Sequence, residues 1–436
     1  MKLILLALLN TAILSAGHAV ISMPLIGLSF FAFILMVLFS PKEFFLPLML
    51  FYLPWSPIMK LSPDSYTMFT IVLPLYFLHS LVTAKGKKGL PFSHTNVILT
   101  ALMAILLLSV KLINGTPVDP NALLFLLMML FIPSYMSKYH PSISFITCSS
   151  FLSLGTISAC IASKVLVAYP HMLAYIVVET WEQMGLVRLS GFYGDSNFYS
   201  IHILISIACL LILVFQQRGF PLALSMAGII LLIYFGTESV SKMFLLTLLA
   251  ILIIWLTSLF SLRQGLGKKI AVLTGITTLI LLVLTSGIFA EQIDDYMFRF
   301  SLASDASSLT TGRSDIWANY FNYFISNPAV FFFGAGYTTT FPDFNAASHS
   351  TIIQMFYQLG LAGIVLIFFW LWEFIRAVWP HGGSQSLTQR LLIFHLGLAC
   401  FLPWLALDML FFDEFFYTIA LFFIGSEYIT SHLQPK

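Results

Sequence analysis

VSKMFLLTLLAILIIWLTSLF, residues 240–260, is an apolar run whose one charged residue, Lys242, stands at its start. A run of about 20 apolar residues is what an α-helix needs to cross ~30 Å of hydrocarbon. The runs of this chain are solid rather than alternating, which argues against the strands of a membrane β-barrel. Similar runs recur along the whole chain, near 3–16, 20–39, 43–57, 66–82, 93–112, 120–136, 143–166, 197–215, 220–236, 268–289, 349–375, 388–407 and 410–430.

The composition supports the same fold class. The chain is 59% hydrophobic and 9% charged with a mean hydropathy of +0.95, whereas about a quarter of the residues of a soluble domain are charged. We therefore predict a single transmembrane domain, 1–436, that is all-α and polytopic with about 12–14 membrane-spanning helices. The first residues, MKLILLALLNTAILSAGHA, also fit a cleavable signal peptide, but a first span followed directly by a second is the commoner arrangement.

Neither the cysteines nor the net charge indicates a further partner. Cys148, Cys160, Cys209 and Cys400 all fall inside apolar runs without paired spacing, so we expect neither disulfides nor a metal cluster. A net charge of +2 over the whole chain provides no face for a polyanion, so we expect no nucleic-acid partner.

The distribution of basic residues predicts the orientation, because lysine and arginine are enriched in cytoplasmic loops. With both termini in the cytoplasm, 13 of the 20 basic residues fall inside. These are Lys2, Lys42, Lys85, Lys87, Lys88, Lys138, Arg218, Arg263, Lys268, Lys269, Arg376, Arg390 and Lys436. Two polar segments, 167–196 and 290–348, then become extracytoplasmic loops.

The ionisable residues of chemical interest gather on that same outer face. They are Arg188, Asp195, Glu238, Lys242, Arg299, Arg313, Asp315 and His349. Lys111 and Lys164 also end spans on this side, and we interpret both as side chains that snorkel to the lipid headgroups. We therefore expect any chemistry to be extracytoplasmic.

The larger outer loop, 290–348, contains the signature of an amphipathic helix. From Arg313 onward, aromatic residues at spacings of three and four place four rings on one helix face that ends at Asn327-Pro328. They are Trp317, Tyr320, Phe321 and Phe324. GAGY, 334–337, has the glycine spacing of a nucleotide loop, but without a βαβ unit we interpret it as a turn.

His349 follows at the first predicted turn of a long span. A helix amino terminus disfavours the imidazolium, so we expect His349 to be neutral and able to accept a proton. An interfacial histidine that merely marks the end of a span is the alternative.

Two further segments of the outer face carry charged and polar groups. Arg188, Asp195 and Asn197 surround two glycines just before a span, where they either face a cavity or form a capped helix start. Lys242 either takes part in a site or snorkels to lipid phosphate, and Glu238, four residues earlier, is its expected partner.

Basic groups beside a neutral histidine at one membrane face suit a lipid-linked diphosphate. Guanidinium groups match phosphate oxygens and stabilise the negative charge that develops as a diphosphate leaves. Closely spaced aspartates that could hold a catalytic cation are limited to Asp294-Asp295, so we expect a metal-free site without cofactors.

Four stretches together resemble the O-antigen ligase and O-antigen polymerase (Wzy) superfamily. TGRSDIW is followed by NPAVFFFGAGY and HSTIIQMFYQLGLAG, and RLSGFYGDSN lies upstream, so the resemblance covers residues 187–365. Three departures are visible. Ser350 stands where many members have Asn, Lys242 replaces a frequent arginine, and the 195–197 segment lacks a central proline.

The resemblance implies a GT-C-like fold in the bacterial inner membrane and metal-independent, inverting glycosyl transfer at the periplasmic face. The donor would be an undecaprenyl-diphosphate-linked oligosaccharide, the acceptor another such repeat unit, and a chain-length regulator a further partner. Arg188 and Arg313 would hold the diphosphate, and His349 would contact it or deprotonate the acceptor. The remaining candidates for substrate binding are Lys242, Asp195, Asn197, Arg299, Trp317 and Glu238.

Three rival functions remain open from the sequence, and the third of them is a non-catalytic membrane scaffold. An O-antigen ligase shares the donor but transfers the glycan to a lipid A core. A flippase of lipid-linked sugars usually places ionisable residues near the membrane midplane. Here only His202 and His395 interrupt the middles of the spans, and we expect each to be a hydrogen-bonded helix residue.

Overall fold

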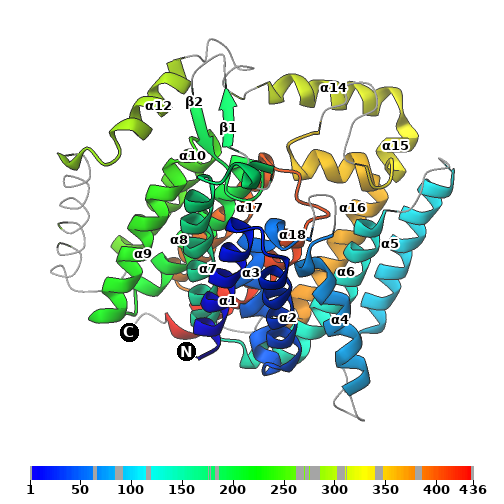
Figure 1. The fold of residues 1–436 in the computed structure, drawn as a ribbon. Helices are drawn as coiled ribbons and strands as arrows, with labels where there is room; N and C mark the ends of the chain where they lie inside the picture. Colours follow the sequence, from blue (N-terminus) through cyan, green and yellow to red (C-terminus); the bar gives the residue numbers. More distant parts are fainter. Residues whose placement is uncertain are drawn as a thin grey trace.

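The computed structural model shows a bundle of α-helices (Figure 1). It describes residues 2–61, 66–83, 92–113, 119–174, 178–181, 186–261, 285–301, 312–338, 347–378 and 385–433, with residues 176, 270, 274 and 310. Nine helices in this part of the chain are long and apolar enough to cross a membrane. The prediction of an all-α, polytopic membrane protein is therefore confirmed.

The nine helices are distributed over the whole length of the chain. They are α1 (Lys2–Ala19), α5 (His94–Ile113), α6 (Pro120–Tyr139), α7 (Phe145–Leu166), α8 (Ser196–Val214), α9 (Phe220–Thr237), α10 (Lys242–Ser261), α16 (Thr351–Val378) and α17 (Leu387–Phe401). Two shorter apolar helices are α2 (Met23–Phe39) and α4 (Met68–Thr83). A further long helix, α18 (Asp413–His432), begins with two acidic residues.

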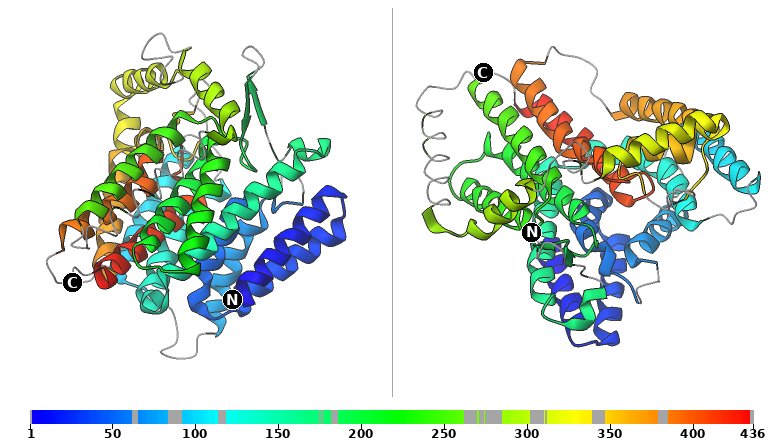
Figure 2. Two further views of the ribbon diagram at one scale, coloured as in Figure 1. Left: turned by 90° about the vertical axis from the view of Figure 1, so that its left-hand side faces the viewer. Right: turned by 90° about the horizontal axis from the view of Figure 1, so that it is seen from above.

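Helix α8 forms the centre of the bundle. It is apolar on every side, which is the pattern of a fully enclosed helix, and 89% of its most apolar window is buried. Helices α7, α9, α10 and α17 pack around it. Helices α1 and α2 lie side by side at the periphery of the bundle, as Figure 2 shows in dark blue.

The predicted span 43–57 is not a single helix. Helix α3 (Phe45–Tyr52) gives way to a 3-10 helix, η2 (Leu53–Ile58), which contains Pro54 and Pro57. Proline cannot donate the backbone hydrogen bond that continues an α-helix. The predicted span 268–289 lies almost entirely outside the described residues.

The described parts of both predicted outer loops lie at the end of the bundle opposite the two termini (Figure 1). Within 167–196, the strands β1 (Val178–Trp181) and β2 (Leu186–Leu189) form an antiparallel hairpin that the sequence did not predict. Within 290–348 lie three helices, α12 (Ala290–Ser301), α14 (Arg313–Ser326) and α15 (Pro328–Phe333).

Helix α16 is broken at Gly360, which adopts φ 64° and ψ −178°. The break frees carbonyl groups one turn earlier, and the GAGY segment uses them. Ala335 N–H donates to the Tyr357 carbonyl at 2.7 Å, and Gly336 N–H donates to the Gln358 carbonyl at 3.0 Å. A Cβ at Gly360 would lie 2.4 Å from the backbone nitrogen of Gly334. GAGY is therefore a docking segment for the broken helix rather than a simple turn.

Candidate functional site

Asp408 organises the segment that carries His349. Its carboxylate accepts hydrogen bonds from the backbone N–H of His349 at 2.8 Å and of Ser350 at 3.0 Å, and from the Ser348 hydroxyl. His349 adopts φ 48°, a left-handed conformation that costs roughly 1–3 kcal/mol for a non-glycine residue. Hydrogen bonds to a charged acceptor offset that cost.

His349 thus lies two residues before α16 instead of in its first turn, so that part of the prediction is wrong. The chain reaches the helix through Ser350, and α16 begins at Thr351. The Thr351 hydroxyl donates to the Leu407 carbonyl at 2.6 Å. This second link fixes the segment around residue 408 against the start of α16.

Helix α14 is joined to the same segment through Trp317. The Trp317 indole donates to the Ser348 carbonyl at 3.0 Å. Tyr320 and Phe324 are buried against Ile353 and Tyr357 of α16. Seen from above in Figure 2, α14 (yellow) lies over α16 (orange).

One of the four predicted rings points elsewhere. Phe321 is 58% exposed, because it lies about 80° around the helix from the midpoint between Tyr320 and Phe324 at 3.6 residues per turn. The four rings lie within an arc of about 100°, as the spacing predicts, but Phe321 at the edge of this arc remains largely exposed.

A cavity of about 210 Å³ lies where these elements meet. His349 and Asp195, which are far apart in the sequence, both line it. Its other walls come from α8, α14, α16, the segments between α15 and α16, and the segment before α18. They are Phe198, Tyr320, Thr338, Ala347, Ser348, Gln354, Tyr357, Gln358, Leu407, Asp408 and Phe412.

Gln358 ties the cavity wall to the segment that ends at Thr338. Its amide nitrogen donates to the Thr338 carbonyl. Its Oε1 atom is buried and has no hydrogen-bond partner among the described residues.

Arg313 does not line the cavity, but its charge interacts with acidic groups that do. Burial lowers the pKa of its guanidinium, Asp195 raises that pKa, Arg188 lowers it and Asp408 raises it. The four charged groups are therefore close enough to interact electrostatically. Of the predicted catalytic residues, His349 lines the cavity together with Asp195, whereas Arg188 and Arg313 are not among its lining residues.

Arg188 is largely enclosed by protein groups. It is 5% exposed, its Nε donates to the Ser239 carbonyl at 3.1 Å, and its guanidinium also donates to the Ser196 hydroxyl. It thus ties β2 to the start of α8 and to the turn before α10. An arginine that makes these contacts positions the site.

Asp195 and Asn197 form a capped start of α8. The Asp195 carboxylate accepts from the Asn197 backbone N–H at 2.6 Å. The Asn197 side-chain oxygen accepts from the Ser241 hydroxyl at 2.7 Å. The capped helix start, one of the two interpretations open from the sequence, is therefore present, and Asp195 lines the cavity as well.

Arg299 and Lys242 lie at the contact of α10 with α12. Arg299 is 8% exposed, and its guanidinium donates to the Val240 carbonyl. The Lys242 ammonium lies 5.5 Å from the centre of the Phe300 ring. Neither residue lines the 210 Å³ cavity.

Glu238 pairs with Lys164 rather than with the predicted partner, Lys242. The Lys164 ammonium forms an ion pair with the Glu238 carboxylate and donates to the Tyr234 hydroxyl at 3.1 Å. The interpretation of Lys164 as a plain snorkelling residue is therefore wrong. Proximity in the sequence suggested Lys242, but helix α10 begins there and turns its first residue toward α12.

Asp408 was missed in the sequence. It belongs to LALDMLFFDEFF, 405–416, a short segment between two spans with three acids, Asp408, Asp413 and Glu414. The sequence did contain a signal for this segment. Its acidic residues stand between two apolar runs, on the predicted outer face where the other ionisable residues also lie. In the described ranges, no group of three or more His, Cys, Asp or Glu residues is arranged to hold a metal ion.

Comparison of the chain with models of known protein families, with curated proteins and with solved structures finds no match.

Proposed function

We propose that the chain is a polysaccharide polymerase of the bacterial inner membrane with a GT-C-like fold. It transfers a glycan from undecaprenyl diphosphate to the terminal sugar of another lipid-linked repeat unit, without a metal ion, at the periplasmic face. The observation that carries the proposal is that His349 and two carboxylates line one cavity and that Arg313 interacts with both carboxylates.

His349 and Arg313 have different roles in the transfer reaction. The bond between the anomeric carbon and the diphosphate oxygen breaks, and the acceptor hydroxyl oxygen forms the new bond to that carbon. His349 takes the hydroxyl proton, and Arg313 stabilises the charge on the departing diphosphate. A half-buried guanidinium suits this task because a charge interaction is stronger where water is excluded.

The supporting residues hold these two groups in place. Asp408 fixes the backbone of His349, and Trp317 ties α14, the helix that begins with Arg313, to the same loop. Arg188 braces the start of α8. Positioning of reacting groups contributes a large part of enzymatic rate enhancement.

A ligase would use the same donor chemistry and differ in its acceptor. A deletion strain distinguishes the two functions. Loss of a polymerase leaves a lipid A core capped by a single repeat unit, whereas loss of a ligase leaves lipid-linked polymer and a bare core.

The same strain tests the site. Complementation with Arg313→Ala or His349→Ala should restore the protein in the membrane without restoring long chains. Arg376→Ala is the matched control, because Arg376 is exposed, pairs with Glu373 and lies near the other end of α16. Long chains in either site variant would refute the proposal.

A further inference from the structure

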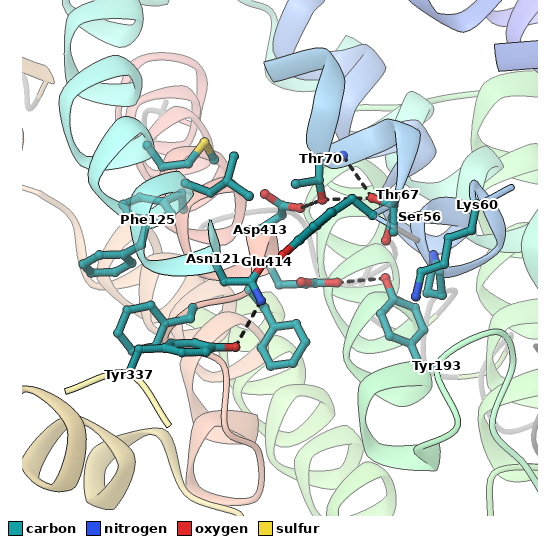
Figure 3. A pocket seen from close by; sticks show the side chains of 17 residues that line it. Ser56, Lys60, Thr67, Thr70, Asn121, Phe125, Tyr193, Tyr337, Asp413 and Glu414 are labelled. Atoms are coloured by element: carbon teal, nitrogen blue, oxygen red, sulfur yellow. Dashed lines mark hydrogen bonds between the residues drawn. The ribbon is translucent and has the colours of Figure 1, made fainter. Parts of the chain in front are cut away.

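Figure 3 shows a second cavity, of about 480 Å³. Phe412 lines both cavities. The volume lies in the range of about 300–1,000 Å³ that is usual for small-ligand sites. Its walls come from η2, α4, α6, the start of α18 and the loop before α8.

Two adjacent carboxylates lie on the wall of this cavity, in the first turn of α18. Glu414 is 4% exposed; it accepts from the Tyr193 hydroxyl at 2.8 Å, and His202 Nε2 lies 3.6 Å away. Asp413 accepts from the Thr70 hydroxyl at 3.4 Å. Figure 3 shows Asp413 beside Thr70 and Glu414 facing the Tyr193 hydroxyl. Buried carboxylates in a membrane protein are costly and usually mark a functional site.

The other walls are aromatic and amide groups. The Asn121 amide donates to the Tyr337 hydroxyl at 3.1 Å, and the Tyr337 ring meets the Phe411 ring edge-on with centroids 4.8 Å apart. Phe412, at the junction of the two cavities, is 47% exposed. Flat aromatic faces beside amide and carboxylate groups can contact both the C–H face and the hydroxyls of a sugar ring.

The charged residues on the cavity wall favour a neutral ligand over an anionic one. Asp413 and Glu414 stand against a single ammonium, that of Lys60, among the lining residues. This balance repels a diphosphate. A carboxylate accepts hydrogen bonds and a protonated carboxyl group also donates one, so in either state the two acids match a neutral group that is rich in hydroxyls.

We infer that the 480 Å³ cavity binds the sugar of the acceptor glycan. Asp413 and Glu414 accept hydrogen bonds from its hydroxyls, and Phe412 places the reacting end beside the cavity that contains His349. This inference rests on the proposed function, because it assigns the acceptor sugar to this cavity and the donor diphosphate to the cavity that contains His349. The two cavities then hold the two substrates of one transfer.

Saturation-transfer difference NMR on the intact protein in lipid nanodiscs tests this division without requiring activity. The probes are the methyl glycosides of glucose, galactose, rhamnose and N-acetylglucosamine. At least one should receive saturation from the wild type. Glu414→Gln and Asp413→Asn should each weaken its binding about tenfold or more, because each removes a charged acceptor of nearly unchanged shape.

The matched control is Glu427→Gln, a carboxylate on the same helix that pairs with His140 away from the cavity. It should bind the sugar as the wild type does. Asp413→Asn serves as the second variant if Glu414→Gln fails to give monodisperse protein.

Two outcomes would overturn the inference. One is that no glycoside shows binding sensitive to Asp413 or Glu414. The other is that radioactive sodium binds and is lost in Glu414→Gln while no sugar binds, which would indicate a cation site of a transporter. Polymerisation is scored separately: elongation without sugar binding rejects this inference alone, whereas sugar binding without elongation rejects the proposed function alone.

Discussion

The carboxylate of Asp408 accepts a hydrogen bond of 2.8 Å from the backbone N–H of His349 and thereby holds that residue in a left-handed conformation beside a cavity. Asp408 also accepts from Ser350, so a single side chain fixes the start of α16. The candidate base is therefore positioned through its backbone, which leaves its imidazole on the cavity wall.

Asp408→Ala should lower the free energy of unfolding by about 2 kcal/mol, because backbone donors lose a charged acceptor. It should also reduce elongation, since the His349 loop is released. Thermal unfolding in detergent and an elongation assay measure the two effects. Asp119→Ala, which removes the cap of α6, should cost about 1 kcal/mol and leave the His349 loop in place. Equal elongation by wild type and Asp408→Ala would contradict this role.

Gly360→Ala should destabilise the fold by more than about 1 kcal/mol, because φ 64° is unfavourable for alanine and its Cβ would meet the Gly334 backbone. Gly397→Ala is the control. That glycine lies inside α17, where the nearest atom to a new Cβ is a Phe422 ring carbon at 3.5 Å, and helical alanine is favoured over glycine. Melting temperatures compare the pair, and an equal or higher value for Gly360→Ala would show that the break in α16 is not required.

Arg188→Lys and Arg313→Lys should have different effects, the first on stability and the second on elongation. Arg188 uses its Nε and a terminal nitrogen on two separate acceptors, and a single ammonium cannot satisfy both. Arg188→Lys should therefore lower the melting temperature. Arg313→Lys keeps the charge near the cavity, so it should fold normally and retain more elongation than Arg313→Ala. If Arg188→Lys melts with the wild type, the bracing role is wrong.

Asp295→Asn should stabilise the protein at neutral pH. Burial and the neighbouring Glu291 and Asp294 raise the pKa of Asp295, so its ionised form is disfavoured in the folded state. This penalty is complete above the raised folded pKa, declines as the pH falls below it, and is gone below the ordinary pKa of the unfolded chain, where both states are protonated. The stabilisation should therefore fade in acid. Thermal melts of both proteins across this pH range measure it, and a pH-independent difference would contradict the electrostatic origin.

The sequence predicted the helical membrane fold because long apolar runs are a local property. It also indicated Asp195 as a helix cap, since Asp before an apolar run is a local signal. The pairing of Asp408 with His349 could not be predicted, because it joins two segments through the packing of α16 against the turn before α18. The same holds for Lys164, whose partner Glu238 lies on another helix.

The break in α16 could not be predicted from the pattern of apolar residues. The run 349–375 looks like one continuous span, and Gly360 within it is compatible with a helix. The close approach of Gly334 excludes a side chain there, and that approach depends on how α15 folds back on α16.

The central claim is that Arg313 and His349 act together on a lipid-linked diphosphate without a metal ion. Elongation of purified lipid-linked repeat units by the purified protein in a chelator tests it most directly. The account predicts long chains from the wild type in the chelator and none from Arg313→Ala or His349→Ala. Elongation that stops in the chelator, or that survives in either variant, would contradict it.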